Sequence, residues 1–181
     1  AVYCEPVAWG KAKAWRLIVA IADVSHYVKP GHPLDSDAIS RATSVYFPRR
    51  VIPMLPEKIS NGLCSLKPEV DRLCMVCDAV IDMDGEVQAY QFYPAVMHSA
   101  QRFTYNTVWE ILSNSNGPEA ARFKHLKKNL DRLYSLYKVL RAARDKRGAI
   151  DFETTETQII SNALGKIERI EPRVRDRKSV V

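Results

Sequence analysis

The sequence lacks most of the features that would identify a function directly. No apolar run approaches the ~20 residues of a membrane-spanning helix, and no signal peptide opens the chain. A glycine-rich phosphate loop, the G-x-S-x-G motif of serine hydrolases and the H-E-x-x-H motif of zinc proteases are also absent. We therefore expect neither a membrane protein nor an enzyme of these three classes.

Cysteine is scarce as well, and its spacing does not favour a metal site. Cys74 and Cys77 form a C-x-x-C pattern within the strand-like run RLCMVCDAVI, and the other two cysteines are Cys4 and Cys64. Residues three apart on a strand point to opposite faces, so the pair cannot easily bind one ion. We predict buried, reduced cysteines, which are typical of a cytoplasmic protein.

The remaining candidates for chemistry are histidines and acidic residues. The four histidines lack the spacing of metal ligands, and surface or packing roles explain them better; they are His26, His32, His98 and His125. Asp35 and Asp37 lie at the start of a predicted helix, where helix capping explains them. Asp23 lies in a predicted buried strand and needs a partner there. Either an internal hydrogen bond or a catalytic role would meet that need.

The composition is that of a globular domain, but the charge is unevenly distributed. Hydrophobic residues make up 46% and charged residues 27% of the 181 residues, which suits one domain with a core. Residues 1–118 hold 11 Lys and Arg against 12 Asp and Glu, whereas residues 119–181 hold 16 against 9. This basic segment indicates either a polyanionic partner or a solvated face. The chain begins within a predicted strand and without Met, so we expect part of a longer protein.

The order of elements predicts an α+β fold with a mixed or antiparallel sheet and helices packed on it. Residues 15–28 are apolar and β-branched, which predicts a buried central strand that leads into a second short strand. Residues 34–42 have acids in the opening turn and predict a short helix. Residues 73–81 and 86–97 predict two strands joined by the turn DMDG at 82–85.

Helices and a second hairpin are expected in the rest of the chain. Residues 105–112 predict a short helix, and residues 118–147 predict a long one with proline in its first turn. The long helix has an apolar stripe at spacings of three and four, formed by Leu126, Leu130, Leu133, Tyr137 and Leu140. Its other faces carry ten Lys and Arg against three Asp and Glu. Residues 150–161 and 166–171 then predict the second hairpin.

Residues 43–66, TSVYFPRRVIPMLPEKISNGLCSL, sustain neither a helical nor a strand period. The segment combines three prolines, two adjacent arginines and an aromatic pair with apolar residues that should avoid water. We expect an ordered, proline-stiffened loop that forms part of a binding surface.

Five segments in order carry a family pattern: VAIADVSHYVKPG, the segment 43–66, VDRLCMVC, FYPAVMHSAQRFTYNTVW and RGAIDFET. Together they resemble the catalytic RNB domain of the RNase II family. The resemblance covers nearly the whole chain, except residues 172–181. It implies a single partial RNB-like domain over residues 1–181.

The resemblance implies a processive, hydrolytic 3′→5′ exoribonuclease that releases nucleoside 5′-monophosphates. Single-stranded RNA, including the 3′ overhang of a structured RNA, would enter a channel that ends at an acidic Mg²⁺ site. The family's metal-binding aspartates match positions before Ala1, and a further active-site segment matches positions after Val181. We therefore expect no catalytic or metal-binding residue within this chain, no activity from it alone, and a monomeric protein.

Five residues are candidates for RNA contacts. By resemblance, Tyr46 stacks on bases toward the channel entrance, Tyr105 positions the terminal nucleotide, and Phe152 closes the stack near the 3′ end. Stacking needs only an aromatic face, so it tolerates any base. Arg49 and Arg50 are candidates for phosphate contacts or are charges at the rim. The alternative for the three aromatic residues is burial in the core.

Two other functions also fit the sequence. The first is a nuclease-inactive RNA-binding module, which substituted aspartates before Ala1 would indicate. The second is a basic adaptor that binds an acidic protein through residues 118–147, and salt-dependent competition by poly(A) would argue against it.

Overall fold

The structure is a computed structural model that describes residues 1–47, 50–149, 156–162 and 164–173. The described chain divides into two compact units. The first contains residues 1–21 and 66–149, and the second contains the rest of the described residues. Helices and antiparallel strand pairs occur together, which confirms the predicted α+β class.

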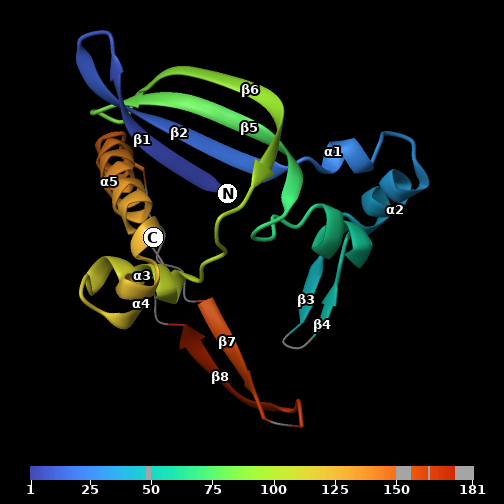
Figure 1. The fold of residues 1–181 in the computed structure, drawn as a ribbon. Coiled ribbons are helices and arrows are strands. Elements are labelled where there is room, and N and C mark those ends of the chain that lie inside the picture. The colour runs from blue at the N-terminus through green and yellow to red at the C-terminus, as the bar shows by residue number, and fades with distance from the viewer. Residues whose placement is uncertain (48–49, 150–155, 163, 174–181) are drawn as a thin grey trace. The chain divides into compact units, whose positions relative to one another are not determined.

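A four-stranded sheet in the order β1-β2-β5-β6 lies at the centre of the first unit (Figure 1). β1 (Val2–Trp9) pairs antiparallel with β2 (Ala12–Ala22), and β5 (Asp71–Asp82) pairs antiparallel with β6 (Val87–His98). The predicted DMDG hairpin is confirmed: Asp82 N donates to Glu86 O at 3.0 Å, and Gly85 takes a φ of 83°. β2 lies inside the sheet, as the apolar run predicted, but only its residues Ala14 and Ala20 are buried and Ile21 is 66% exposed, so the predicted burial of the strand is wrong.

The expected second short strand after β2 is wrong. Residues 24–27 form the helical turn α1 (Val24–Tyr27) instead. Asp23 begins this turn, since its side chain accepts hydrogen bonds from His26 N at 3.1 Å and Ser25 Oγ at 2.6 Å. A local capping interaction therefore overrides the strand preference of the surrounding β-branched residues.

The predicted long helix is two helices. α3 (Tyr105–Ser113) is confirmed, but residues 118–147 form α4 (Pro118–Arg122) and α5 (Lys124–Lys146) with a break at Phe123. The Phe123 ring is buried with Ile111 and Ala120 and lies edge-on to Phe103, with ring centres 4.9 Å apart. Placing this ring in the core takes Phe123 out of helical geometry, with φ −106° and ψ 28°.

α5 packs against β1 at one end of the sheet (Figure 1). Leu136 is 2% exposed and packs with Cys4 and Ile81, and Leu133 and Leu140 flank this cluster. The apolar stripe is therefore confirmed at Leu133 and Leu140. The sequence stripe included Tyr137, but the fully buried position is its neighbour Leu136.

The second unit contains α2 (Pro33–Arg41), two hairpins and a π-helical turn. β3 (Val45–Phe47) pairs with β4 (Arg50–Ile52), and the segment Lys58–Leu63 is π-helical. Residues 43–66 were expected to be an irregular loop, so these short regular elements correct that expectation. The second predicted hairpin is confirmed by β7 (Glu156–Ser161) and β8 (Ile167–Arg173). No helix among the described residues is long and apolar enough to cross a membrane.

Candidate nucleic-acid interface

Tyr46 lies on β3 with its side chain open to solvent. It pairs with Val51 across the hairpin, and 77% of its surface is exposed. The alternative that Tyr46 is a core residue of this chain is therefore wrong. An exposed ring on a short hairpin is free to offer one face to a base.

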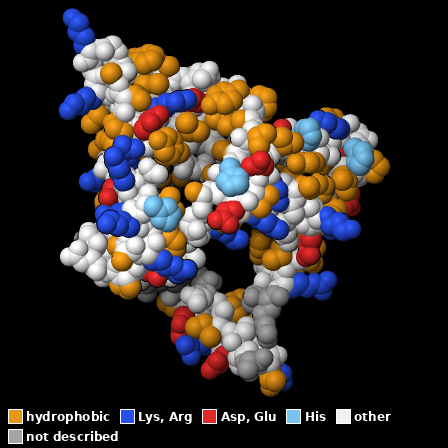
Figure 2. Space-filling model, viewed as in Figure 1, with side chains coloured by type: hydrophobic (Ala, Val, Ile, Leu, Met, Phe, Trp, Pro, Cys, Tyr) orange, Lys and Arg blue, Asp and Glu red, His pale blue; other side chains and the backbone are white. Residues whose placement is uncertain are grey.

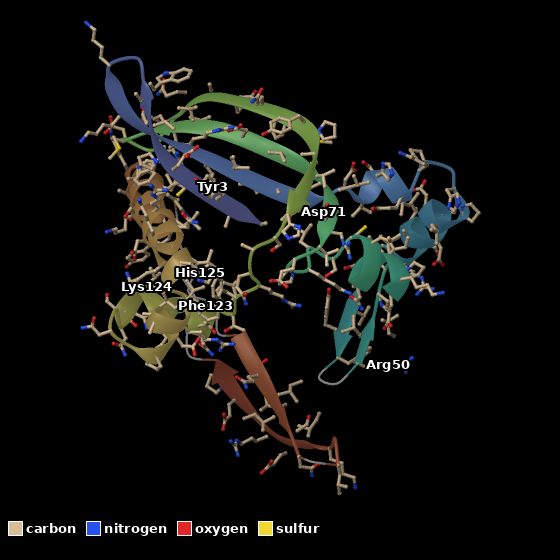
Figure 3. All side chains as sticks on the ribbon, in the orientation of Figure 1. Tyr3, Arg50, Asp71, Phe123, Lys124 and His125 are labelled. Carbon is tan, nitrogen blue, oxygen red and sulfur yellow. The ribbon has the colours of Figure 1, made fainter. Side chains whose placement is uncertain are left out.

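Arg50 lies on the opposite face of the same hairpin. It pairs with Phe47, and residues directly across an antiparallel pair share a face, whereas neighbours along a strand alternate. Arg50 and the 53%-exposed Phe47 therefore form one surface, and Tyr46 with Val51 forms the other. Figure 3 labels Arg50 on β4, where its side chain extends away from the hairpin.

This arrangement changes the expected site. One nucleotide cannot stack on Tyr46 and meet Arg50 from a single face, so an RNA that uses both must pass around the hairpin. Phe47 is an exposed aromatic residue that the sequence reasoning missed, although the alternation within VYF would have placed it opposite Tyr46. Arg49 and Phe152 lie outside the described residues.

Local hydrogen bonds hold the hairpin to the segments on either side. Ser44 Oγ accepts from Met54 N at 2.9 Å, which closes the base of the hairpin. Arg41 donates to Asp37 at 2.9 Å and to the carbonyl oxygen of Pro53 at 3.4 Å. These contacts tie the hairpin to α2, and a surface ordered in advance loses less entropy when a ligand binds.

Tyr105 is the first residue of α3, in the first unit. Thr104 caps this helix, since its hydroxyl accepts from Thr107 N at 3.2 Å. The Tyr105 side chain is 68% exposed. The alternative interpretation, in which Tyr105 is buried in the core of this chain, is therefore also wrong.

An ion pair on the sheet between the buried Asp78 and the partly exposed Arg16 was not predicted. Asp78 on β5 is 6% exposed and accepts from Arg16 Nε at 2.9 Å and Arg16 Nη2 at 2.6 Å. The Tyr93 hydroxyl donates to the same carboxylate at 3.3 Å, and Glu5 lies 3.6 Å from Arg16. The hydrogen bonds from Arg16 lower the pKa of Asp78 despite the opposing effect of burial. Asp78 is therefore fully engaged as a structural acid, and the 62-residue separation from Arg16 left no sequence signal.

The acidic residues singled out in the sequence have local partners. Hydrogen bonds from Ser25 and His26 lower the pKa of Asp23, so the internal hydrogen bond accounts for it. Asp35 lies in the first turn of α2 and accepts from Gly31 N at 2.9 Å, while Asp37 pairs with Arg41. The N-cap itself is His32, whose Nδ1 accepts from Leu34 N at 3.2 Å.

The described residues show no metal centre. They contain no group of three or more His, Cys, Asp or Glu side chains that could hold an ion. Cys74 and Cys77 form no disulfide; Cys74 is fully buried with its Sγ 3.4 Å from Ala95 O, and Cys77 is half-buried on the other face of β5. The residues of this part of the chain do not fit a Mg²⁺ site, and we assign no chemical step to them.

α5 gives the first unit a strongly basic surface. Figure 2 shows Lys and Arg side chains gathered on the side where α5 lies. The acidic residues of α4 and α5 pair with cations three or four residues away: Glu119 with Arg122, Asp131 with Lys127, and Asp145 with Arg141. These three acids offset only three of the ten cations in residues 118–147. The excess favours contact with a polyanion.

Comparison with known proteins identifies the family of the chain. The family model described as "RNB domain" matches residues 1–180. Ribonuclease R of Vibrio cholerae serotype O1 is 54% identical over 176 residues, which cover 97% of this chain and 21% of that protein. The chain therefore spans about a fifth of the length of this curated relative.

Solved structures of Mycoplasma genitalium RNase R also match. The complex with ribose-methylated single-stranded RNA has a TM-score of 0.85 and 34% identity, covering 99% of this chain and 27% of that chain. The complex with double-stranded RNA has the same TM-score and identity and covers 31% of that chain.

The fold is that of an RNB domain. The chain belongs to the RNB family and is similar to bacterial ribonuclease R along almost its whole length.

Proposed function

We propose that this chain forms part of the RNA channel of a processive, hydrolytic 3′→5′ exoribonuclease. The parent polypeptide degrades single-stranded RNA, and structured RNA that has a 3′ overhang, to nucleoside 5′-monophosphates in the cytoplasm. Residues 1–181 act as one partial RNB domain. The Mg²⁺ ligands and catalytic acids belong to parts of the parent polypeptide outside this chain.

The observation that carries the proposal is the 54% identity to a ribonuclease R over nearly the whole chain. Relatives of this fold have been solved with single-stranded and double-stranded RNA, which supports RNA as the ligand. The exposure of Tyr46 and Tyr105 supports a stacking role for each. Tyr46 holds a base toward the channel entrance, Tyr105 holds the terminal nucleotide, and Phe152 holds a base near the 3′ end. Arg50 and Arg49 contact phosphates.

The test uses the parent polypeptide and an RNA labelled at its 5′ end. With Mg²⁺ present, we expect the labelled RNA to shorten stepwise from its 3′ end while 5′-mononucleotides are released. Chelation of Mg²⁺ should stop the reaction. Internal cleavage would contradict the proposal. Tight RNA binding without shortening would instead identify the nuclease-inactive module.

A further inference from the structure

A cavity of about 520 Å³ lies in the first unit, between α5 and the turn that joins β5 to β6. Its inner surface is mostly apolar and includes the side chains of Trp15, Met83 and Val139. Lys138 and Lys146 line it from α5, and Asp84 lines it from the β5–β6 turn. An apolar floor with a few charged groups at the edge is the usual composition of a small-ligand site.

The charges around the cavity favour an anion. Two lysines face one aspartate, and the lysines lie eight residues apart on α5, roughly 12 Å along the helix axis. Lys138 also contacts the Tyr134 ring, with Nζ 5.2 Å from the ring centre. An anionic ligand would therefore gain more from the lysines than it loses to Asp84.

The Trp15 indole carries an unsatisfied hydrogen-bond donor. Its Nε1 is buried and has no hydrogen-bond partner among the described residues. A buried donor without an acceptor is unfavourable. Because Trp15 lines the cavity, we expect a ligand bound there to offer an acceptor to this donor.

The lysines continue along α5 beyond the cavity. Lys124 and Lys128 are exposed nearer the start of the helix. On an ideal helix, these two and the cavity lysines lie within about 80° of one another around the axis. A row of cations of this length suits a chain of phosphates better than a single anion. An aromatic surface beside a cationic track is the usual means of binding single-stranded nucleic acid.

We propose that the cavity binds one nucleotide of an RNA strand, in addition to the channel contacts of Tyr46 and Tyr105. The base lies against Trp15, Met83 and Val139, and its phosphates contact Lys138 and Lys146. The strand continues along α5 past Lys128 and Lys124. The inference deepens the proposed function, because it rests on RNA as the substrate class.

The test follows Trp15 fluorescence in a chain with Trp9→Phe and Trp109→Phe, which leaves Trp15 as the sole tryptophan. Adenosine 5′-monophosphate is the minimal probe, and a short oligoadenylate is the strand. We expect both probes to quench the fluorescence. The oligoadenylate should reach half-maximal quenching at about one tenth of the concentration of adenosine 5′-monophosphate or below, because it gains the α5 contacts. If the double variant does not fold, the ¹H–¹⁵N indole resonance of Trp15 in the unaltered chain reports the same binding.

Charge variants separate this site from general attraction to a basic protein. Lys138→Gln with Lys146→Gln should weaken binding of both probes about fivefold or more, and Asp84→Asn should strengthen it about twofold. Lys29→Gln with Lys166→Gln removes the same net charge from exposed positions of the second unit and should leave the quenching unchanged.

Three outcomes would overturn the inference. Trp15 could fail to respond to either probe, or the Lys138 and Lys146 variant could bind as tightly as the unaltered chain. Quenching by polyglutamate but not by oligoadenylate would assign the cavity to an acidic protein. Each of these results leaves the exoribonuclease assay of the parent polypeptide unaffected, so the failure of this site and the failure of the proposed function are distinguishable.

Discussion

At the scale of single residues, Asp78 shows how a buried charge is held in the sheet. Its carboxylate is removed from water and depends on Arg16 for two hydrogen bonds. Because these bonds lower the folded pKa below the ordinary value of 3.8, the pair stabilises the fold above that pH. The stabilisation is lost as the pH falls through the lowered pKa.

Arg16→Met should destabilise the chain by ~2 kcal/mol near neutral pH, because it leaves the buried Asp78 carboxylate without a counter-charge and with only its neutral donors such as Tyr93. The free energy of unfolding in urea measures this loss. The difference from the unaltered chain should shrink in acid, since protonation removes the unpaired charge. Arg16→Met combined with Asp78→Leu is the control and should recover most of the stability. An equal loss in the single and double variants would show that Arg16 contributes packing rather than charge pairing.

Replacing Tyr46 tests its proposed role in stacking on RNA bases. In the parent polypeptide, Tyr46→Ala should weaken RNA binding by ~1–3 kcal/mol, about tenfold or more in Kd, because one stacking face is lost. Its unfolding free energy should change little, since the side chain is 77% exposed. The bond-cleavage step should remain largely intact, and the final products should become longer as short strands are released earlier.

Tyr90→Ala is the matched control for Tyr46→Ala. Tyr90 is 68% exposed on β6, where no RNA contact is proposed, and it contacts Phe92 with ring centres 5.7 Å apart. Its replacement should leave the Kd for RNA unchanged. Equal weakening of RNA binding by both substitutions would remove the stacking role from Tyr46.

At the scale of elements, the β5–β6 turn and α5 fit together at Gly85. This residue has a φ of +83°, and a Cβ atom there would lie 2.6 Å from Ala143 Cβ and 3.2 Å from Val139 O. Two features therefore require glycine at position 85: the left-handed backbone conformation and the close approach of the helix.

Gly85→Ala should lower the free energy of unfolding by about 3 kcal/mol, from backbone strain together with overpacking against α5. Gly10→Ala separates the two causes, because Gly10 has a φ of +60° but no atom within 4 Å of the added Cβ. The control should lose only about 1 kcal/mol in the same urea titration. Similar losses in both variants would mean that the contact with α5 relaxes without cost.

Many of the helices, strands and turns could be predicted from the sequence because interactions between residues close in the chain determine them. The DMDG turn, the proline that opens α4 and the stripe at Leu133 and Leu140 all act over a few residues. Two helical features were missed because one residue outweighed the pattern around it. Asp23 caps a turn inside a strand-like run, and Phe123 leaves helical geometry to enter the core.

The candidate site was predictable only in part. The resemblance identified Tyr46 and Tyr105, and the structure shows that both are exposed. The sequence could not place Arg50 on the face opposite Tyr46, because that depends on the hairpin register. It also could not show the cavity beside Trp15, whose walls come from β2, the β5–β6 turn and α5.

At the scale of the whole molecule, the described residues form exposed aromatic and basic surfaces that suit RNA binding. The described residues hold no cluster that fits a metal, and the chain spans about a fifth of a curated ribonuclease R. The hydrolysis that we propose for the parent polypeptide depends on metal-activated water and stabilisation of the leaving oxygen. We therefore expect the 181-residue chain to bind poly(A) and leave it at full length in the presence of Mg²⁺.

The measurement pairs a gel assay of labelled poly(A) with fluorescence anisotropy of the same RNA. The observed affinity should fall as salt rises, with a slope of about 0.7 per phosphate contact, because the cations of α5 release counterions on binding. A sample carried through the same purification without the chain controls for contaminating nucleases. Stepwise shortening from the 3′ end that follows the chain through purification would place a catalytic centre within residues 1–181. If the affinity for RNA does not change with salt concentration, α5 is not part of the interface, because exposed lysines attract RNA through charges that salt screens.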